Sequence, residues 1–142
     1  MATKKVLIVE DDKILAETLQ AILTDTGLYQ IAQANDGATG LKLADEFQPD
    51  LIILDLLMAG TSGMDLLRKW QETGLSSRVP VIVATNLDQL PFMNHALNMG
   101  VRNYFLKSEM SPEAIVDHCA KVLAEAAKPG LPPATPSAPA QA

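Results

Sequence analysis

Short apolar runs alternate along this chain with longer segments of helical periodicity. The apolar runs cover residues 6–9, 51–54, 81–84 and 104–106, and runs of this length are typical of strands buried in a sheet. Residues 29–34, which include two glutamines, predict a short and weaker strand. Between these strands, apolar residues recur every three or four positions, as on one face of a helix. They are Ile14, Leu15, Leu19, Ile22 and Leu23, then Leu41, Ala44 and Phe47, then Leu66, Leu67 and Trp70, then Met93, Ala96 and Leu97.

Polar residues and helix breakers mark where these helices begin and end. Asp12 is a predicted N-cap, and the helix that follows it stops near Gly27. The turn at residues 35–37 (Asn-Asp-Gly) opens the second helix. Ser111, followed by proline and glutamate, predicts the start of a last helix that runs to about Ala127.

Strands that alternate with helices in this way predict an α/β fold. Parallel strands need right-handed crossovers, so helices are expected on both faces of the sheet. Five strand–helix units commonly form a doubly wound parallel sheet in the order 2-1-3-4-5. The ligand crevice of such a sheet lies at the carboxyl ends of strands 1 and 3, where the direction of winding reverses.

Five polar side chains follow four of the predicted strands. Glu10 and Asp11 come after strand 1, Asp55 after strand 3, Thr85 after strand 4 and Lys107 after strand 5. Each alone fits an ordinary cap or surface residue, but parallel strands bring their carboxyl ends to one edge. Three carboxylates at one edge favour a divalent cation, and a hydroxyl with an ammonium suits an anion that has several oxygens. The pattern therefore predicts a metal and a phosphoryl group, with Asp55 as nucleophile.

Composition and charge narrow the class of protein. The 142 residues favour one domain, and the 48% of hydrophobic residues is enough to form a core. The net charge of −6 argues against binding to nucleic acid or to an anionic membrane surface. Neither a signal sequence nor an apolar run long enough to span a membrane is evident, so we expect a cytoplasmic protein. The single cysteine, Cys119, lies on an apolar helix face and is expected to be buried.

The expected domain covers residues 1–127, and residues 128–142 differ from it in composition. This segment is rich in proline and alanine and has one charged residue, so we expect a disordered tail. Other chemistry has less support. The turn after strand 1 is not a glycine-rich phosphate loop, and His95 and His118 have no partner pattern.

Four segments resemble the response-regulator receiver domain of two-component signalling, including its stand-alone chemotaxis-type members. They are residues 6–12 (VLIVEDD), residues 50–60 (DLIILDLLMAG) with Gly63, residues 79–85 (VPVIVAT) and residues 100–107 (GVRNYFLK). The resemblance covers about residues 4–127 and implies a flavodoxin-like fold. Each segment is weak evidence alone, whereas their order and spacing together are specific.

The resemblance implies a phosphoacceptor with a metal site. Asp55 would accept a phosphoryl group from a histidine kinase or a histidine phosphotransfer protein. Mg²⁺, or Mn²⁺ in its place, would be held by Asp55, by Asp11 directly, by Glu10 mostly through water and by the backbone carbonyl of Leu57. Lys107 would contact a phosphoryl oxygen.

The resemblance also implies a conformational switch. Thr85 would move toward the phosphoryl group, and Tyr104 would turn inward into the space that Thr85 leaves. The surface formed by the fourth long helix, the strand at residues 104–106 and the last helix would then bind a downstream protein, as a monomer or a phosphorylation-dependent dimer. We expect no enzyme that turns over a free substrate, only self-catalysed phosphoryl transfer and slow autodephosphorylation.

The chain departs from the family pattern at three positions. Ala59 and Ser108 stand where the family usually has proline, which affects the rigidity of the two loops. Asn86 stands where a smaller residue is usual, which affects access to the acceptor or choice of partner. None of the three removes a chemical group that the transfer needs. Leu57 and Leu87 lie two residues past Asp55 and Thr85, and their apolar side chains lead to the hypothesis that the phosphorylated state decays slowly.

Two other functions stay open from sequence alone. One is a receiver-like interaction module whose regulation does not need phosphorylation. The presence of Asp55, Lys107 and the acidic pair argues against this function. The other is a small Mg²⁺-dependent phosphohydrolase, which would need a substrate pocket that the short chain does not suggest. The preferred interpretation is a stand-alone phosphoacceptor that binds a partner or passes the phosphoryl group on.

Overall fold

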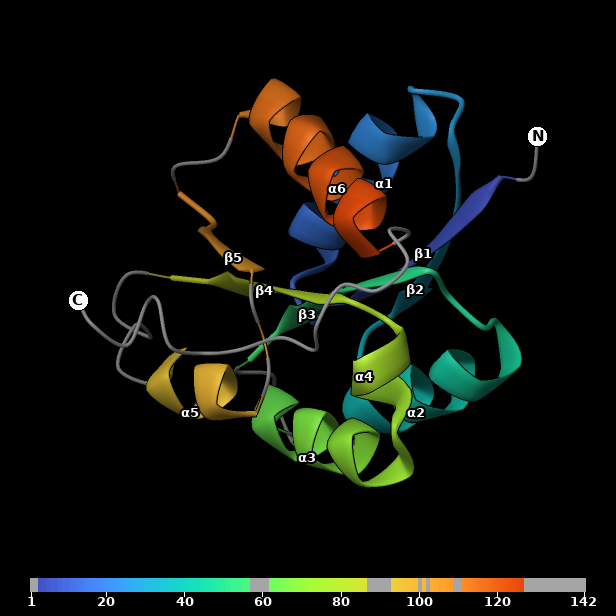
Figure 1. Ribbon diagram of the computed structural model, residues 1–142. Coiled ribbons are helices and arrows are strands. Elements are labelled where there is room, and N and C mark those ends of the chain that lie inside the picture. Colours follow the sequence, from blue (N-terminus) through green and yellow to red (C-terminus); the bar gives the residue numbers. More distant parts are fainter. Residues whose placement is uncertain are drawn as a thin grey trace.

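The strands form one parallel sheet. The computed structural model describes residues 3–56, 62–86, 93–99, 101, 103–108 and 111–126. The elements are β1 (Lys4–Val9), α1 (Lys13–Thr24), β2 (Tyr29–Ala34), α2 (Gly37–Glu46), β3 (Leu51–Asp55), α3 (Gly63–Thr73), α4 (Leu75–Arg78), β4 (Val81–Thr85), α5 (Met93–Asn98), β5 (Asn103–Leu106) and α6 (Pro112–Ala126). The five strands lie in the order β2-β1-β3-β4-β5 with every neighbouring pair parallel (Figure 1). The predicted doubly wound topology is therefore confirmed.

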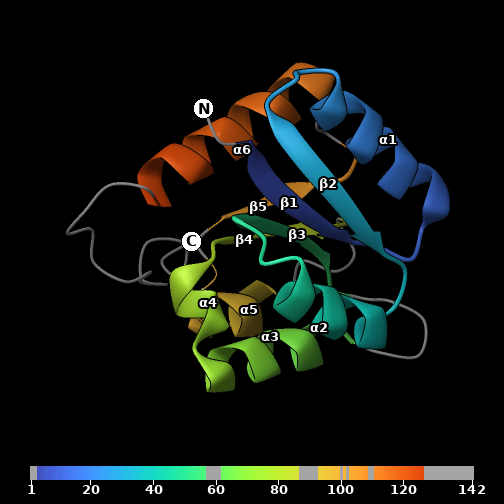
Figure 2. The same cartoon turned by 90° about the vertical axis from the view of Figure 1, so that its right-hand side faces the viewer.

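Helices cover both faces of the sheet. Helices α1 and α6 lie on one face, and α2, α3, α4 and α5 lie on the other (Figures 1 and 2). The two faces have separate cores, because successive strand residues point to opposite sides. In β1, for example, Leu7 and Val9 pack toward α2 and α3, whereas Val6 and Ile8 pack toward α1 and α6. Strands β3 and β4 are buried along their whole length, as expected for central parallel strands.

The predicted helix starts are confirmed by their caps. The Asp12 carboxylate accepts a hydrogen bond from the Leu15 amide at 3.2 Å, and the Ser111 hydroxyl accepts one from the Ala114 amide at 3.2 Å. Asp36, in the predicted turn, accepts one from the Thr39 amide at 2.8 Å. Such caps satisfy amides that have no partner inside the helix.

The apolar stripe predicted for the first helix is wrong at one position. Ile14 is 80% exposed, whereas Ala16, Leu19 and Leu23 form the buried face of α1. Ile14 lies two residues from Ala16, which places it on the opposite side of a helix that has 3.6 residues per turn. Alanine is only weakly hydrophobic, so the spacing of the larger apolar residues pointed to Ile14 instead of Ala16.

A short helix, α4, was not expected between α3 and β4. Gly74 ends α3 in the left-handed conformation at φ 85°, and its amide donates to the Gln71 carbonyl. Helix α4 begins at the next residue and buries Leu75. Four residues are too few for helical periodicity to be recognised in the sequence.

Two further predictions can be compared with the structure. Cys119 is 1% exposed, and burial raises the pKa of its thiol to about 12, so its predicted place in the core is confirmed. None of the helices in the described part of the chain has the length and hydropathy of a membrane span. The tail predicted for residues 128–142 lies outside the described residues.

Candidate functional site

The strand register brings the predicted site residues to one edge of the sheet. Val9 is paired with Leu54, so Glu10 and Asp55, which follow them, end neighbouring strands. On the other side of β3, Asp55 is paired with Ala84, and Thr85 is paired with Leu106. The amide of Lys107 donates to the Thr85 carbonyl at 2.8 Å, which fixes the start of the lysine side chain beside β4.

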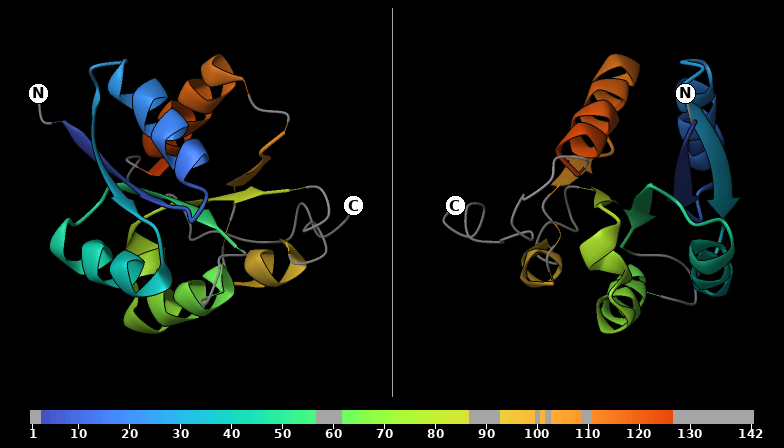
Figure 3. Two further views of the ribbon diagram at one scale, coloured as in Figure 1. Left: turned by 180° about the vertical axis from the view of Figure 1, so that it is seen from behind. Right: turned by 45° about the vertical axis from the view of Figure 1, so that its right-hand side comes forward.

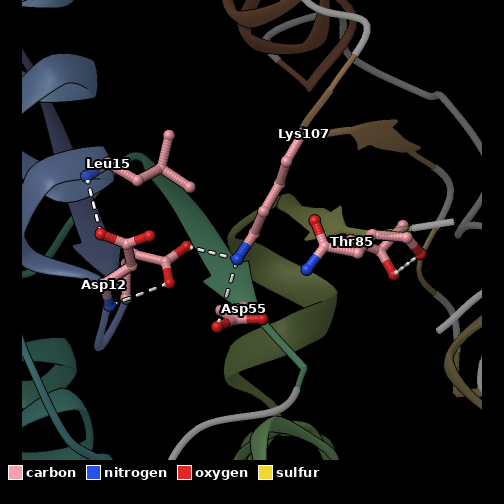
Figure 4. A network of polar contacts seen from close by, with 7 residues as sticks. Asp12, Leu15, Asp55, Thr85 and Lys107 are labelled. Carbon is pink, nitrogen blue, oxygen red and sulfur yellow. Dashed lines mark hydrogen bonds and ion pairs between the residues drawn. The ribbon is translucent and has the colours of Figure 1, made fainter. Parts of the chain in front are cut away.

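Lys107 connects two carboxylates that come from different strands. Its Nζ lies 2.9 Å from Glu10 Oε1 and 3.3 Å from Asp55 Oδ2. Figure 4 shows the lysine side chain extending to the Asp55 carboxylate. The two acids are 2% exposed each, so these ion pairs lie where water screens them little. The predicted convergence of Asp55 and Lys107 is therefore present.

Three acids form a group that fits a metal ion. Glu10, Asp11 and Asp55 each offer a carboxylate oxygen, and these oxygens lie within 4.8 Å of one another. Asp11 is exposed, whereas Glu10 and Asp55 are buried. The three carboxylates outnumber the single ammonium of Lys107, so a divalent cation would balance the remaining negative charge of the group. Oxygen ligands, several of them charged, are the donor set that Mg²⁺ prefers.

The environment changes the proton affinity of two of these groups. Burial, together with a hydrogen bond and repulsion from Asp55, raises the pKa of Glu10 to about 7, although Lys107 acts in the opposite direction. Burial works to lower the pKa of Lys107, but its contacts with Glu10 and Asp55 outweigh burial and raise the pKa above its usual value. The site thus holds a stable ammonium beside carboxylates that repel one another.

Glu10 is also held by the backbone. Its second oxygen, Oε2, accepts a hydrogen bond from the Asp12 amide at 3.2 Å. Asp12 in turn caps α1 through Leu15 (Figure 4). The helix cap and the orientation of Glu10 therefore depend on the same turn.

The two predicted switch residues differ in exposure. Thr85 is fully buried, and its hydroxyl donates to the carbonyl of Asn86 at 3.2 Å. Tyr104 is 40% exposed on β5, the strand beside it. An inward turn of Tyr104 would therefore begin from an exposed side chain.

Gly63 positions Asp55 in a way that the sequence did not reveal. A Cβ at this residue would lie 2.3 Å from the Asp55 carbonyl oxygen and 2.7 Å from Leu56 Cα. The Gly63 amide donates to the Leu56 carbonyl at 2.6 Å, so the start of α3 lies directly against the end of β3. Gly63 can be seen in the sequence, but the need for glycine there comes from a close contact between the backbones of α3 and β3. No local sequence pattern predicts that contact.

The remaining predicted positions are placed only in part. Leu57, Ala59 and Leu87 lie outside the described residues, whereas Asn86 and Ser108 are exposed beside the site. His95 is exposed on α5, and His118 is half-buried on α6 with its ring edge-on to Phe105. A groove of about 640 Å³ between the end of α1 and the start of α6 includes none of the five site residues.

Comparison with known proteins identifies the family. The family model described as the response regulator receiver domain matches residues 6–120. The chain belongs to this family. The transcriptional regulatory protein YdfI of Bacillus subtilis is 32% identical over 108 residues, which are 75% of this chain and 49% of YdfI. Protein PilH of Pseudomonas aeruginosa is 31% identical over 103 residues, which are 72% of this chain and 84% of PilH.

Other relatives and solved structures agree with this receiver domain. The nitrate/nitrite response regulator NarL of Escherichia coli K12 is 32% identical over 112 residues, 78% of this chain and 50% of NarL. The chain thus spans about half the length of several curated relatives that it matches. A CheY-like receiver domain from Methanospirillum hungatei superposes with a TM-score of 0.82 at 26% identity, covering 91% of this chain and all of that one.

Proposed function

We propose that this receiver domain is a phosphoacceptor switch whose acceptor is Asp55. The observation that carries the proposal is the convergence of Asp55, two further carboxylates and Lys107 at one edge of the sheet. A histidine kinase or a histidine phosphotransfer protein would be the donor. An Asp55 carboxylate oxygen would form a bond to phosphorus while the phosphorus–nitrogen bond of the donor breaks, and the electron pair would stay on the imidazole.

The residues around Asp55 would position the phosphoryl group and balance its charge. Lys107, already 3.3 Å from Asp55, would pair with a phosphoryl oxygen. Glu10, Asp11, Asp55 and the backbone carbonyl of Leu57 would hold Mg²⁺ or Mn²⁺. The metal ion would neutralise charge on the carboxylates and on the transferred group. Such transfer depends mainly on positioning and electrostatic stabilisation, and both are supported by the buried acids and the lysine.

The switch would convert this local change into a change of surface. Thr85 would turn its hydroxyl from the Asn86 carbonyl to a phosphoryl oxygen, and Tyr104 would turn inward from its exposed position. The surface formed by α5, β5 and α6 would then favour a downstream protein or a second copy. Phosphorylation would shift a population between two states, because the phosphoryl group makes contacts in only one of them.

Intact mass after incubation with Mg²⁺ and acetyl phosphate tests the acceptor. We expect one phosphoryl adduct in the parent chain and none in Asp55→Asn. Asp65→Asn is the matched control, because Asp65 is an exposed acid on α3 and should leave the adduct intact. An unmodified parent would instead favour the phosphorylation-independent interaction module. Continuous release of phosphate without an adduct would favour the phosphohydrolase.

We also propose that this domain acts without binding nucleic acid. The net charge of −6 supports this proposal. A mobility-shift assay with duplex DNA at low salt, with and without acetyl phosphate, should show no complex. A complex in either state would contradict the proposal.

A further inference from the structure

The edge strand β2 has an open row of backbone hydrogen-bonding groups. In the described part of the chain, β2 pairs with β1 alone. The carbonyls of Leu28 and Ala34 accept hydrogen bonds from Lys4 and Glu10, at 3.3 and 3.0 Å. Because the direction of backbone groups alternates along a strand, the amides and carbonyls of Tyr29, Ile31 and Gln33 point away from the sheet.

Among the residues that the structure describes, this edge lacks the features that usually prevent strand pairing. Edge strands are commonly protected by lysines, prolines, bulges or a covering element. Residues 28–34 (LYQIAQA) contain no charged residue and no proline, and their register with β1 runs without interruption. The right-hand view of Figure 3 shows β2 at the outer margin of the ribbon, with no described element beyond it. The opposite edge strand, β5, is shorter and is followed directly by Lys107.

The sequence of this edge is complementary to itself. If two copies pair antiparallel about Ile31, the three outward residues of each copy match those of the other: Ile31 faces Ile31, and Tyr29 faces Gln33. In an antiparallel pair, each such match exchanges two hydrogen bonds, so all the outward groups would be satisfied. On the other face, Leu28, which is 58% exposed, would lie against Ala34 of the other copy. No like charges meet along the strand.

We propose that β2 is a self-association surface, on which a second copy of this chain adds its own β2 antiparallel and joins the two sheets. Such an isologous pair has closed two-fold symmetry. Its area is small, so the dimer is expected to be weak and to form at high protein concentration. Because each copy carries a net charge of −6, added salt should strengthen the pairing by screening the repulsion. The outer edge of β2 contains none of the five site residues, and it is distinct from the α5–β5–α6 surface.

Sedimentation of the full chain without Mg²⁺ or phosphodonor tests the proposal independently of Asp55 chemistry. Gln30 is exposed, and in the proposed register Gln30 of one copy lies diagonally across from Gln30 of the other, within reach of long side chains. We expect a concentration-dependent dimer in the parent and self-association weakened about threefold or more in Gln30→Lys and in Gln30→Glu. An equal mixture of the two variants should restore the dimer by pairing opposite charges.

Two controls make this result specific to β2. Gln71→Lys places the same charge on an exposed residue of α3 and should leave the dimer unchanged. Amide exchange measured by NMR should show that Tyr29, Ile31 and Gln33 become protected at high concentration, whereas Gln30 and Ala32 are protected at every concentration. A monomer at all concentrations and salts, or a dimer indifferent to charge at residue 30, would overturn the proposal.

Discussion

Lys107 Nζ lies between Glu10 Oε1, at 2.9 Å, and Asp55 Oδ2, at 3.3 Å. The ammonium therefore contacts the same carboxylates that form the candidate metal site. A divalent cation at that site and the lysine would compete for the negative charge of these acids, so the lysine has to be shared between the carboxylates and an incoming phosphoryl group.

The Lys107→Met variant should separate two roles of the lysine, which are pairing with the carboxylates and contacting the phosphoryl group. Removal of the competing ammonium should tighten Mg²⁺ binding roughly tenfold, the effect of relieving an interaction of about 1.4 kcal/mol. It should also slow phosphorylation by acetyl phosphate about 100-fold, because a charged contact to the phosphoryl group is lost. Calorimetry measures the first effect and intact mass against time measures the second.

Lys121→Met is the control for this prediction, because Lys121 is exposed on α6. Both properties should stay at the parent values in that variant. Weaker Mg²⁺ binding in Lys107→Met would mean that the ammonium supports the metal site instead of competing with it.

Gly63→Ala should disturb the acceptor through the backbone. The added methyl group would lie 2.3 Å from the Asp55 carbonyl oxygen, so the end of β3 or the start of α3 has to move. We expect a loss of about 1–3 kcal/mol in the free energy of unfolding, together with slower phosphorylation. Urea denaturation and intact mass check the two effects.

Gly40→Ala provides the comparison, since Gly40 is also a buried helical glycine. Its added methyl group would meet the Val9 side chain at 3.2 Å and not a backbone atom. A small shift of that side chain, offset by the better helix propensity of alanine, should leave stability within about 1 kcal/mol of the parent. Equal losses in the two variants would show that contact with the β3 backbone has no special effect.

Much of the fold followed from the sequence because its signals are strong and local. The uninterrupted apolar runs that became β3 and β4, and the acids and lysine that follow strands, predicted a parallel sheet with a polar edge. The exposure of Ile14 could not be predicted from spacing alone, because Ala16 occupies the buried position. The role of Gly63 was hidden for a different reason, since it depends on contact with the end of β3 at Asp55, and a loop separates the two in the chain.

Gln48→Gly should stabilise the protein. Gln48 follows the end of α2 with φ 52°, a left-handed conformation that disfavours residues with a Cβ. Glycine removes this strain but gains freedom in the unfolded state, so we expect a net increase of up to about 1 kcal/mol in the free energy of unfolding. Thermal and urea unfolding measure it. Gln71→Gly, within α3, should instead lose about 1 kcal/mol, and a similar loss in Gln48→Gly would contradict the argument.

Leu57 and Leu87 lead to a prediction about the lifetime of the phosphorylated state. The family resemblance implies that the side chains at these two positions flank the path of the water that hydrolyses the acyl phosphate. Apolar side chains cannot orient this water, so the parent should lose its phosphoryl group slowly. Leu57→Asn and Leu87→Glu should lose it faster, as followed by intact mass after the donor is removed. Unchanged or slower loss in both variants would refute the hypothesis.

His118 should make stability depend on pH. Burial against the sheet face and the nearby charge of Lys121 lower the pKa of His118, although Glu125 on the same helix opposes the shift. A histidine with a lowered pKa in the folded state binds its proton more readily when the chain is unfolded. Its contribution to stability is therefore present above the ordinary histidine pKa of about 6.5 and is lost as the pH falls through the lower, folded value.

The measurement is urea unfolding of the parent and of His118→Asn between about pH 7.5 and pH 5, the range in which histidine takes up a proton. Other groups titrate in both proteins, so the difference between them isolates His118. We expect the parent to lose more stability than the variant as the pH falls. His95→Asn is the control because His95 is exposed on α5, and it should follow the parent. Parallel curves for the parent and His118→Asn would show that the protonated imidazole is accommodated beside Phe105 without cost.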